Sequence, residues 1–131
     1  MDMDYIDPPA FGDPVGPFTR PIRVADILYI SGCSAFSYLT GPVWKRYLPA
    51  DFEQQARLVF ENLRAVVEAA AGTMVDIFKT TVMLKDRAHF ESFNAIRAKY
   101  FPQNPPIGTD FVTELVRDYM LIEVGAMARL D

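Results

Sequence analysis

The chain has 131 residues, half of them hydrophobic, which is enough for one domain with a substantial core and too few for two independent ones. Its 13 Lys and Arg residues are outnumbered by 17 Asp and Glu residues, and the net charge of −4 without a basic run disfavours a nucleic-acid partner. One cysteine and one histidine exclude an internal disulfide and an ordinary zinc site within one chain, and no motif indicates another metal.

The N-terminal residues MDMDYIDPP are acidic and resemble neither a secretory signal nor a transit peptide. No apolar run reaches the roughly 18–20 residues that span a bilayer. We therefore expect a cytoplasmic protein that does not bind a membrane. Residues 1–17 contain four of the ten prolines and few periodic apolar positions, so they predict an irregular arm. The arm belongs to a single domain that spans residues 1–131.

The first half of this domain begins with strands and continues into a helix. The β-branched and aromatic residues of IRVADILYIS (22–31) predict two strands with a turn at Ala25-Asp26, and residues 34–50 predict a loop. Apolar residues then recur at helical spacing from Asp51 to Ala71. Asp51 is the expected N-cap of this helix.

Gly72 is the expected left-handed residue after the helix. DIFKTTVML (76–84) predicts a strand, and a second helix is expected from Asp86 to Pro102. Two strands at about 107–115 and 119–129 complete the chain. The order β-β-α-β-α-β-β predicts an α+β fold in which two helices cover one face of a mixed sheet.

Six phrases, in this order and spacing, resemble the Rid (YjgF-like) family of small deaminases, from about residue 14 to residue 130. The phrases are PVGPFTR (14–20), LYISGC (28–33), NLRAVVEAAAG (62–72), DIFKTTVMLKD (76–86), FNAIRAKYF (93–101) and IEVGAMA (122–128). The resemblance implies a chorismate-mutase-like (YjgF-type) fold that assembles as a homotrimer. It also implies a small-molecule pocket at each subunit interface and no cofactor.

The deaminating members of the family carry a phrase P-A-R-S/T, whose arginine binds the substrate carboxylate. The matching phrase here is PIGT (106–109), so Gly108 stands at the arginine position and Thr109 follows it. Loss of a planar guanidinium with five donors removes a specific anion site. The resemblance therefore supports the fold and argues against an unmodified imino-acid substrate, and it suggests Gly108→Arg as a way to restore the usual activity.

Glu123 matches the glutamate that positions or activates water in the family. It stands among apolar residues and glycine in YMLIEVGAMA (119–128), so burial is expected to raise its pKa toward the range useful for acid–base catalysis. A general base at this position suits the attack of water on an imine carbon. A second interpretation stays open, in which Glu123 pairs with a lysine or arginine across the sheet or a subunit interface.

Asp110 lies two residues after Gly108, so strand alternation places both on one face. If Asp110 and Glu123 lie within about 6 Å, both carboxylates cannot easily ionise, and one acts as an acid beside its basic partner. Together with the missing arginine, Asp110 predicts either a pocket that prefers a neutral or cationic ligand, or one that performs proton transfer or hydration with the carboxylate pair. The alternative is that Asp110 is an exposed strand residue or accepts a hydrogen bond from a turn.

The resemblance assigns four further residues to the pocket wall. Phe18 replaces a tyrosine and lacks its hydroxyl, Ser31 matches a serine, Cys33 stands where glutamine is common, and Asn94 matches an asparagine of the second helix. Cys33 is not expected to be a nucleophile, because a buried free cysteine usually acts as a small hydrophobe. His89, the only histidine, is expected at the surface near the start of a helix. Asn94 alternatively forms a cap or an interhelical hydrogen bond.

Two cationic stretches leave further alternatives open. Arg20 either supplies the missing guanidinium from the other side of the site, or pairs with Glu123, or remains a solvated charge. Trp44, beside Lys45 and Arg46, is either a lid over the pocket or an anchor for its own loop.

Three classes of function follow. The leading hypothesis is an enzyme that hydrolyses (deaminates) or isomerises an imine, an enamine or an aminomuconate-type metabolite, with Glu123 as base and Asp110 as second carboxylate. The second is a ligand-binding or regulatory trimer that kept the pocket and lost the chemistry. The third, RNA cleavage, fits poorly with a net charge of −4, because phosphate binding needs cations.

Overall fold

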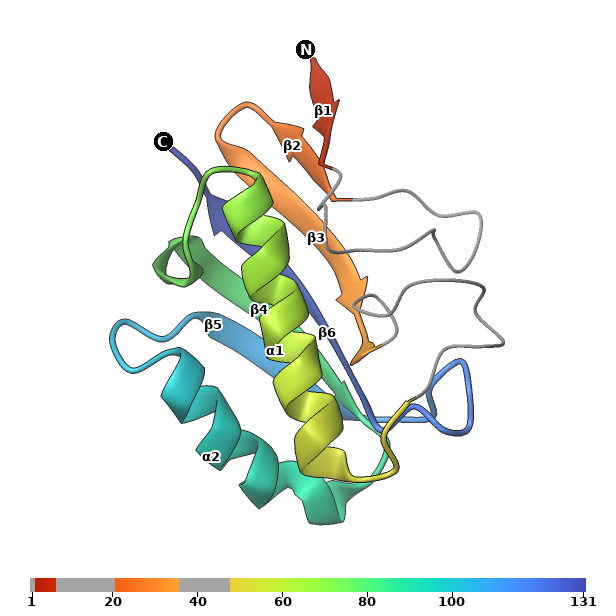
Figure 1. The fold of residues 1–131 in the computed structure, drawn as a ribbon. Coiled ribbons are helices and arrows are strands. Elements are labelled where there is room, and N and C mark those ends of the chain that lie inside the picture. The colour runs from red at the N-terminus through yellow and green to blue at the C-terminus, as the bar shows by residue number, and fades with distance from the viewer. Residues whose placement is uncertain (1, 7–20, 36–47) are drawn as a thin grey trace.

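A computed structural model describes residues 2–6, 21–35 and 48–131 of the chain. Within these residues, six strands form one sheet, and two α-helices lie on one side of it (Figure 1). The elements are β1 (Met3–Tyr5), β2 (Ile22–Val24), β3 (Ile27–Cys33), α1 (Phe52–Ala69), β4 (Ile77–Leu84), α2 (Phe90–Tyr100), β5 (Ile107–Val112) and β6 (Ile122–Arg129).

The strands follow the order β1-β2-β3-β6-β4-β5 across the sheet. The β4–β5 pair is parallel and the other pairs are antiparallel, so the sheet is mixed, and β5 is an edge strand. The predicted α+β architecture with two helices on one face is therefore confirmed.

The N-terminal arm differs from the prediction. Strand β1 pairs with β2, with Met3 opposite Val24 and Tyr5 opposite Ile22, so residues 1–17 are not irregular throughout. The observed order is β-β-β-α-β-α-β-β. A strand of three residues is too short to produce a readable alternation, and its hydrogen bonds to β2 stabilise it instead.

Helix α1 begins where the sequence predicts and ends differently. The Asp51 side chain accepts a hydrogen bond from the backbone N–H of Gln54 at 3.0 Å, which caps the N-terminus. At the C-terminus the left-handed residue is Ala71, with φ of 65°, and not Gly72. A Cβ on Gly72 would lie 2.6 Å from Leu130 Cδ2. Gly72 therefore lies close to the side chain of Leu130, which follows β6, and it does not adopt the left-handed backbone.

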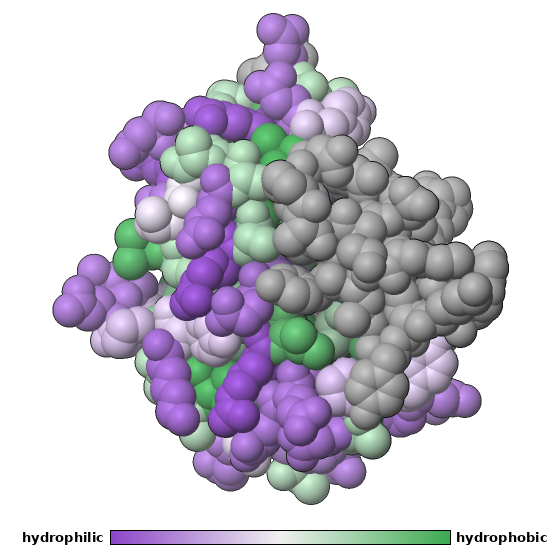
Figure 2. Space-filling model, viewed as in Figure 1, coloured by the Kyte–Doolittle hydropathy of each residue, from purple (hydrophilic) through white to green (hydrophobic). Residues whose placement is uncertain are grey.

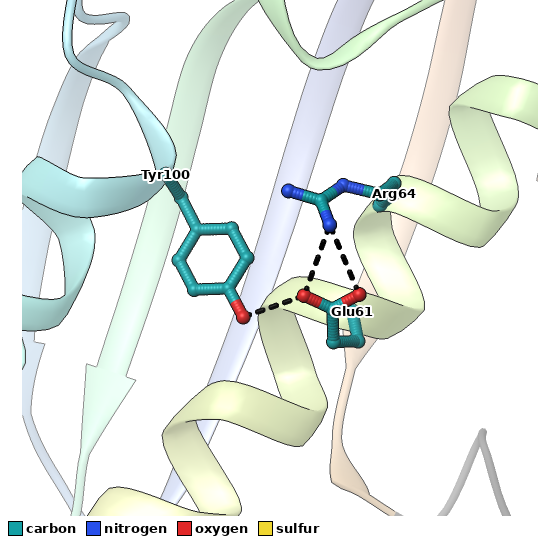
Figure 3. Close-up of polar contacts among 3 residues, drawn as sticks. All are labelled: Glu61, Arg64 and Tyr100. Carbon is teal, nitrogen blue, oxygen red and sulfur yellow. Dashed lines mark hydrogen bonds and ion pairs between the residues drawn. The ribbon is translucent and has the colours of Figure 1, made fainter.

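The two helices pack together through aromatic rings and a polar triad. Phe60 of α1 stacks on Phe93 of α2, with ring centroids 5.9 Å apart. Beside them, the Tyr100 hydroxyl donates to Glu61 Oε2 at 2.6 Å, and Arg64 Nη1 lies 3.2 Å from both carboxylate oxygens (Figure 3). These contacts fix α2 against α1 and so position the residues that α2 presents to β5.

His89 is half-buried, contrary to the surface position expected from the sequence. Its ring stacks on Phe52, with centroids 4.3 Å apart and an interplanar angle of 12°. The residue lies in a 3₁₀ turn, Arg87–His89, that Asp86 caps by accepting a hydrogen bond from Ala88 N at 2.9 Å. The turn precedes α2 and brings the imidazole onto the first turn of α1.

The two faces of the sheet have different surroundings. Figure 2 shows the side that carries α1 and α2, where hydrophilic side chains dominate the helix surfaces. On the opposite face no helix of the described residues covers the strands. None of the helices in the described part of the chain is long and apolar enough to cross a membrane.

Candidate functional site

The register of the three strands β5, β4 and β6 decides which predicted site residues share a face. Val82 of β4 pairs with Asp110 on one side and with Val124 on the other, and both valines are buried beneath the helices. Asp110 therefore faces the helices. Glu123 pairs with Met83, one position along, and faces the opposite side of the sheet. The prediction that Asp110 and Glu123 form a pair of neighbouring carboxylates is therefore wrong within a single chain.

The helix-side residues line a groove between α2 and β5. Its volume is about 440 Å³. Three predicted pocket residues lie in it together, namely Asn94, Gly108 and Asp110. The apolar wall consists of Ala98, Phe101, Pro105 and Pro106.

The groove also contains Arg97, which sequence reasoning missed. Its guanidinium forms a two-point ion pair with Asp110, with Nη1–Oδ1 at 3.0 Å and Nη2–Oδ2 at 3.2 Å. Nη2 also donates to Asn94 Oδ1, and the guanidinium carbon lies 4.5 Å from the centre of the Phe93 ring. Asp110 is thus an exposed strand residue, as the alternative interpretation expects, and it pairs with a helix cation. Asn94 belongs to the same network, because its Oδ1 atom accepts a hydrogen bond from Arg97.

Gly108 leaves no room for a side chain in this backbone. A Cβ at this position would lie 2.6 Å from Thr80 Oγ1 and 2.7 Å from the Thr80 carbonyl oxygen. Any larger residue therefore requires β5 to move away from β4. The Gly108→Arg substitution that the sequence suggests is consequently not a simple restoration of a lost arginine.

Glu123 lies on the other face, against the bulge of β3. The bulge falls between Ile30 and Cys33, and a Cβ added to Gly32 would overlap Glu123 Oε1, so the carboxylate rests directly over the Gly32 backbone. The side chain is half-buried, and burial raises its pKa above the ordinary value of 4.5. Within the described ranges, Glu123 has no hydrogen-bond or ion-pair partner.

Three other residues predicted to bind substrate lie away from the groove. Cys33 is buried in the core, where burial, together with the charge of Glu123, raises the pKa of its thiol to about 12. It is a small core hydrophobe, as expected, and is not exposed to a ligand. Ser31 is exposed on β3, and Thr109 is exposed and pairs with Thr81 on the Glu123 side of the sheet. Phe18, Arg20 and Trp44 lie outside the described residues.

The face that carries Glu123 is rich in exposed apolar side chains. Tyr29 is 45% exposed, Phe111 50% and Ile107 72%. Phe111 pairs with Met83 and Tyr29 with Met127, which places these residues across the width of the sheet. No group of three or more His, Cys, Asp or Glu side chains that could hold a metal occurs among the residues that the structure describes.

Comparison with known proteins places this geometry in a family. The model of the family described as endoribonuclease L-PSP matches residues 10–130. The chain belongs to this family. A RutC family protein of Saccharolobus solfataricus is 37% identical to it over 117 residues, which cover 88% of this chain and 89% of that protein. The Rid (YjgF-like) resemblance seen in the sequence is therefore confirmed.

Solved structures of the family share the fold. A Rid-family protein of unknown function from Yersinia pestis aligns with a TM-score of 0.86 at 25% identity, covering 98% of this chain and 100% of that chain. RidA from an Antarctic Psychrobacter species gives the same TM-score at 24% identity, covering 97% of this chain and 99% of that chain. The YjgF-type fold expected from the sequence is thus confirmed.

Proposed function

We propose that the protein is an enzyme of the Rid family that hydrolyses a small imine, with Glu123 as the general base. The observation that carries this proposal is the state of Glu123. Its carboxylate is half-buried beside the Gly32 backbone, has no partner among the described residues, and has a raised pKa. A carboxylate in this condition is suited to accept a proton from water and to return it later.

The proposed reaction needs only water as a second reactant. Glu123 removes a proton from water while the water oxygen bonds to the carbon of the protonated imine and the C=N electron pair moves to nitrogen, which gives a neutral carbinolamine. Glu123 then returns its proton to the nitrogen. The hydroxyl proton passes to the Glu123 carboxylate as the carbonyl forms and ammonia leaves, and solvent takes that proton from Glu123. An enamine, including one of aminomuconate type, enters the same sequence after tautomerising to its imine.

We also propose that the site is completed between subunits of a homotrimer. Two observations support this assembly. The Glu123 face exposes Tyr29, Ile107 and Phe111, an apolar surface that association would cover. In addition, the groove at the β5 edge and Glu123 lie on opposite faces of one sheet, so a neighbouring copy is required to bring them to one ligand.

The test is ammonia release from imines generated in the assay. One imine comes from an amino acid and an amino-acid oxidase, and the other from benzylamine and an amine oxidase, so that only the first carries a carboxylate. Wild type should accelerate hydrolysis of at least one, and Glu123→Gln should reduce this acceleration by roughly 100-fold or more. The control is Glu114→Gln, which changes an exposed glutamate outside the strands.

Two results would contradict the proposal. If Glu123→Gln hydrolyses both imines as fast as wild type, Glu123 is not the base. If wild type binds small ligands and accelerates neither reaction, the pocket belongs to a ligand-binding or regulatory trimer instead.

RNA cleavage, which the family description names, is not proposed for this chain. The net charge is −4, and the guanidinium in the groove is already paired with Asp110. Phosphate binding depends on available cations, so we expect no salt-dependent RNA binding in a filter or fluorescence assay.

A further inference from the structure

The groove between α2 and β5 holds a positive charge that is already neutralised inside the chain. The side chains of Arg97 and Asp110 are each a quarter exposed, so the pair is accessible from the groove and only partly screened by water. The Phe93 ring lies against the guanidinium, and Asn94 Oδ1 accepts a further hydrogen bond from it. The guanidinium is therefore held in one orientation.

The hydrogen bonds of Arg97 leave no pair of adjacent N–H donors free to bind a carboxylate. A guanidinium binds a carboxylate through two parallel N–H donors, either Nη1 with Nη2 or Nε with Nη2. Both faces include Nη2, whose two hydrogens are directed at Asp110 Oδ2 and Asn94 Oδ1. The donors that remain, on Nε and Nη1, belong to different faces. An incoming carboxylate cannot bind in the bidentate way while Asp110 holds the Nη1/Nη2 face and Asn94 holds the Nε/Nη2 face.

We propose that Asp110 acts as an internal carboxylate that occupies Arg97, so that the groove rejects carboxylate ligands and takes uncharged ones. The negative charge of Asp110 repels a second carboxylate at the polar end. A neutral carbonyl or amide oxygen, in contrast, accepts from the single free donors of Arg97 without displacing Asp110. Ala98, Phe101, Pro105 and Pro106 supply the apolar wall for the rest of such a ligand.

The preference for uncharged ligands does not depend on the proposed function. Only its extension to the substrates of the enzyme rests on that function. The substrate would be an imine without a free carboxylate at the end that enters the groove. Aminomuconate-type compounds, which carry carboxylates, would be disfavoured. Position 110 would then determine specificity, because the chemistry of its side chain decides whether Arg97 is available.

The experiment compares the equilibrium binding of benzoate and benzamide, which have the same shape and differ in charge. Both are titrated by NMR into wild type, Asp110→Ala and Asp110→Asn. Asp26→Ala is the matched control, because it removes the same charge and releases the exposed Arg129, whose Nε lies 3.2 Å from Asp26 Oδ2. Folding of each variant is checked by thermal melting, and Asp110→Asn keeps the side-chain volume if Asp110→Ala does not fold.

Wild type and Asp26→Ala should bind benzamide more tightly than benzoate. Asp110→Ala should shift this preference toward benzoate by roughly 10- to 100-fold, the range expected for a hydrogen-bonded charge pair, and Asp110→Asn should shift it less. The proposal is overturned if wild type prefers benzoate, if both folded Asp110 variants keep the wild-type preference, or if neither ligand binds any of the proteins. Since no turnover is measured, failure of the imine hydrolase proposal would not affect this result.

Discussion

The carboxylate of Glu123 on β6 rests on the backbone of Gly32 in the β3 bulge, where even a methyl group would overlap its Oε1 atom. Glycine at position 32 therefore defines where the proposed base sits. We predict that Gly32→Ala displaces the Glu123 side chain and lowers imine hydrolysis by roughly 10-fold or more, because small shifts of a catalytic group are costly. Steady-state ammonia release measures this effect.

Gly125→Ala is the matched control for this substitution. A Cβ at Gly125 would lie 3.5 Å from the Ile30 carbonyl oxygen and 3.9 Å from Gly32 N, which are ordinary contacts. The same chemical change on the neighbouring strand should leave both the fold and the hydrolysis rate close to wild type. Equal losses in the two variants would show that the Gly32 effect is a general response of the sheet.

Glu123 should make stability depend on pH in a specific direction. Burial raises the pKa of this carboxyl in the folded state, so the folded protein holds the proton more tightly than the unfolded chain. The free energy of unfolding then falls as pH rises from the ordinary glutamate range, near 4.5, through the raised value. Glu123→Gln should therefore melt above wild type at neutral pH, and the two melting temperatures should converge below about pH 4.

Melting curves recorded from acid to neutral pH test this prediction. If the difference in melting temperature between wild type and Glu123→Gln is constant over the whole pH range, ionisation of Glu123 does not destabilise the folded protein. Glu91→Gln, an exposed glutamate of α2, serves as the reference for the loss of one surface charge.

Gly108 should tolerate no side chain without loss of stability. A Cβ there would meet both the hydroxyl and the backbone carbonyl of Thr80, so Gly108→Ala should destabilise the protein by about 1–3 kcal/mol. Chemical denaturation gives the value. Thr109→Ala, at the next and exposed position of β5, should change the free energy of unfolding by much less. A Gly108→Ala variant as stable as wild type would show that β5 shifts freely relative to β4.

The hydrogen bond between Tyr100 and Glu61 should contribute to the docking of α2 on α1. Tyr100→Phe removes a 2.6 Å contact to a carboxylate and should cost about 1 kcal/mol at pH 7, measured by chemical denaturation. Burial, followed by this hydrogen bond, raises the pKa of Tyr100 from 10.0 to about 12. The contribution is thus complete below pH 10 and is lost as the pH rises through about 12.

Tyr5→Phe, in strand β1, is the control for the loss of a phenol hydroxyl, because Tyr5 is 57% exposed. It should leave stability nearly unchanged. If Tyr100→Phe is equally neutral, the triad of Figure 3 is a surface feature without energetic weight.

The sequence was most informative where residues repeat with a clear period. The apolar spacing from 51 to 71 and the Asp51 cap predict α1, because a helix buried on one side repeats apolar residues at helical spacing over about five turns. Strand β1 has only three residues, which is too few to show a repeating pattern. The sequence predicts the left-handed conformation for Gly72, and Ala71 adopts it instead, since the sequence does not reveal that Leu130 packs against Gly72.

The candidate site was predicted in part, for a similar reason. Alternation correctly placed Gly108 and Asp110 on one face of β5, but it cannot show which face of β6 carries Glu123 relative to them. That relation depends on the register of both strands with β4, which lies far away in sequence. Arg97 was missed because a charged residue on a helix normally points to solvent. Its spacing of three residues from Asn94 is the only local signal of their contact.

Complementation between two inactive variants tests directly whether the proposed site is shared between subunits. Glu123→Gln lacks the proposed base, and Ala98→Trp fills the groove. If the site is built from the groove of one subunit and Glu123 of another, co-assembly of equal amounts should restore about a quarter of the wild-type imine hydrolysis, because a quarter of the interfaces are intact. A mixture as inactive as its parents, with both variants shown to co-assemble, would contradict a site shared between subunits.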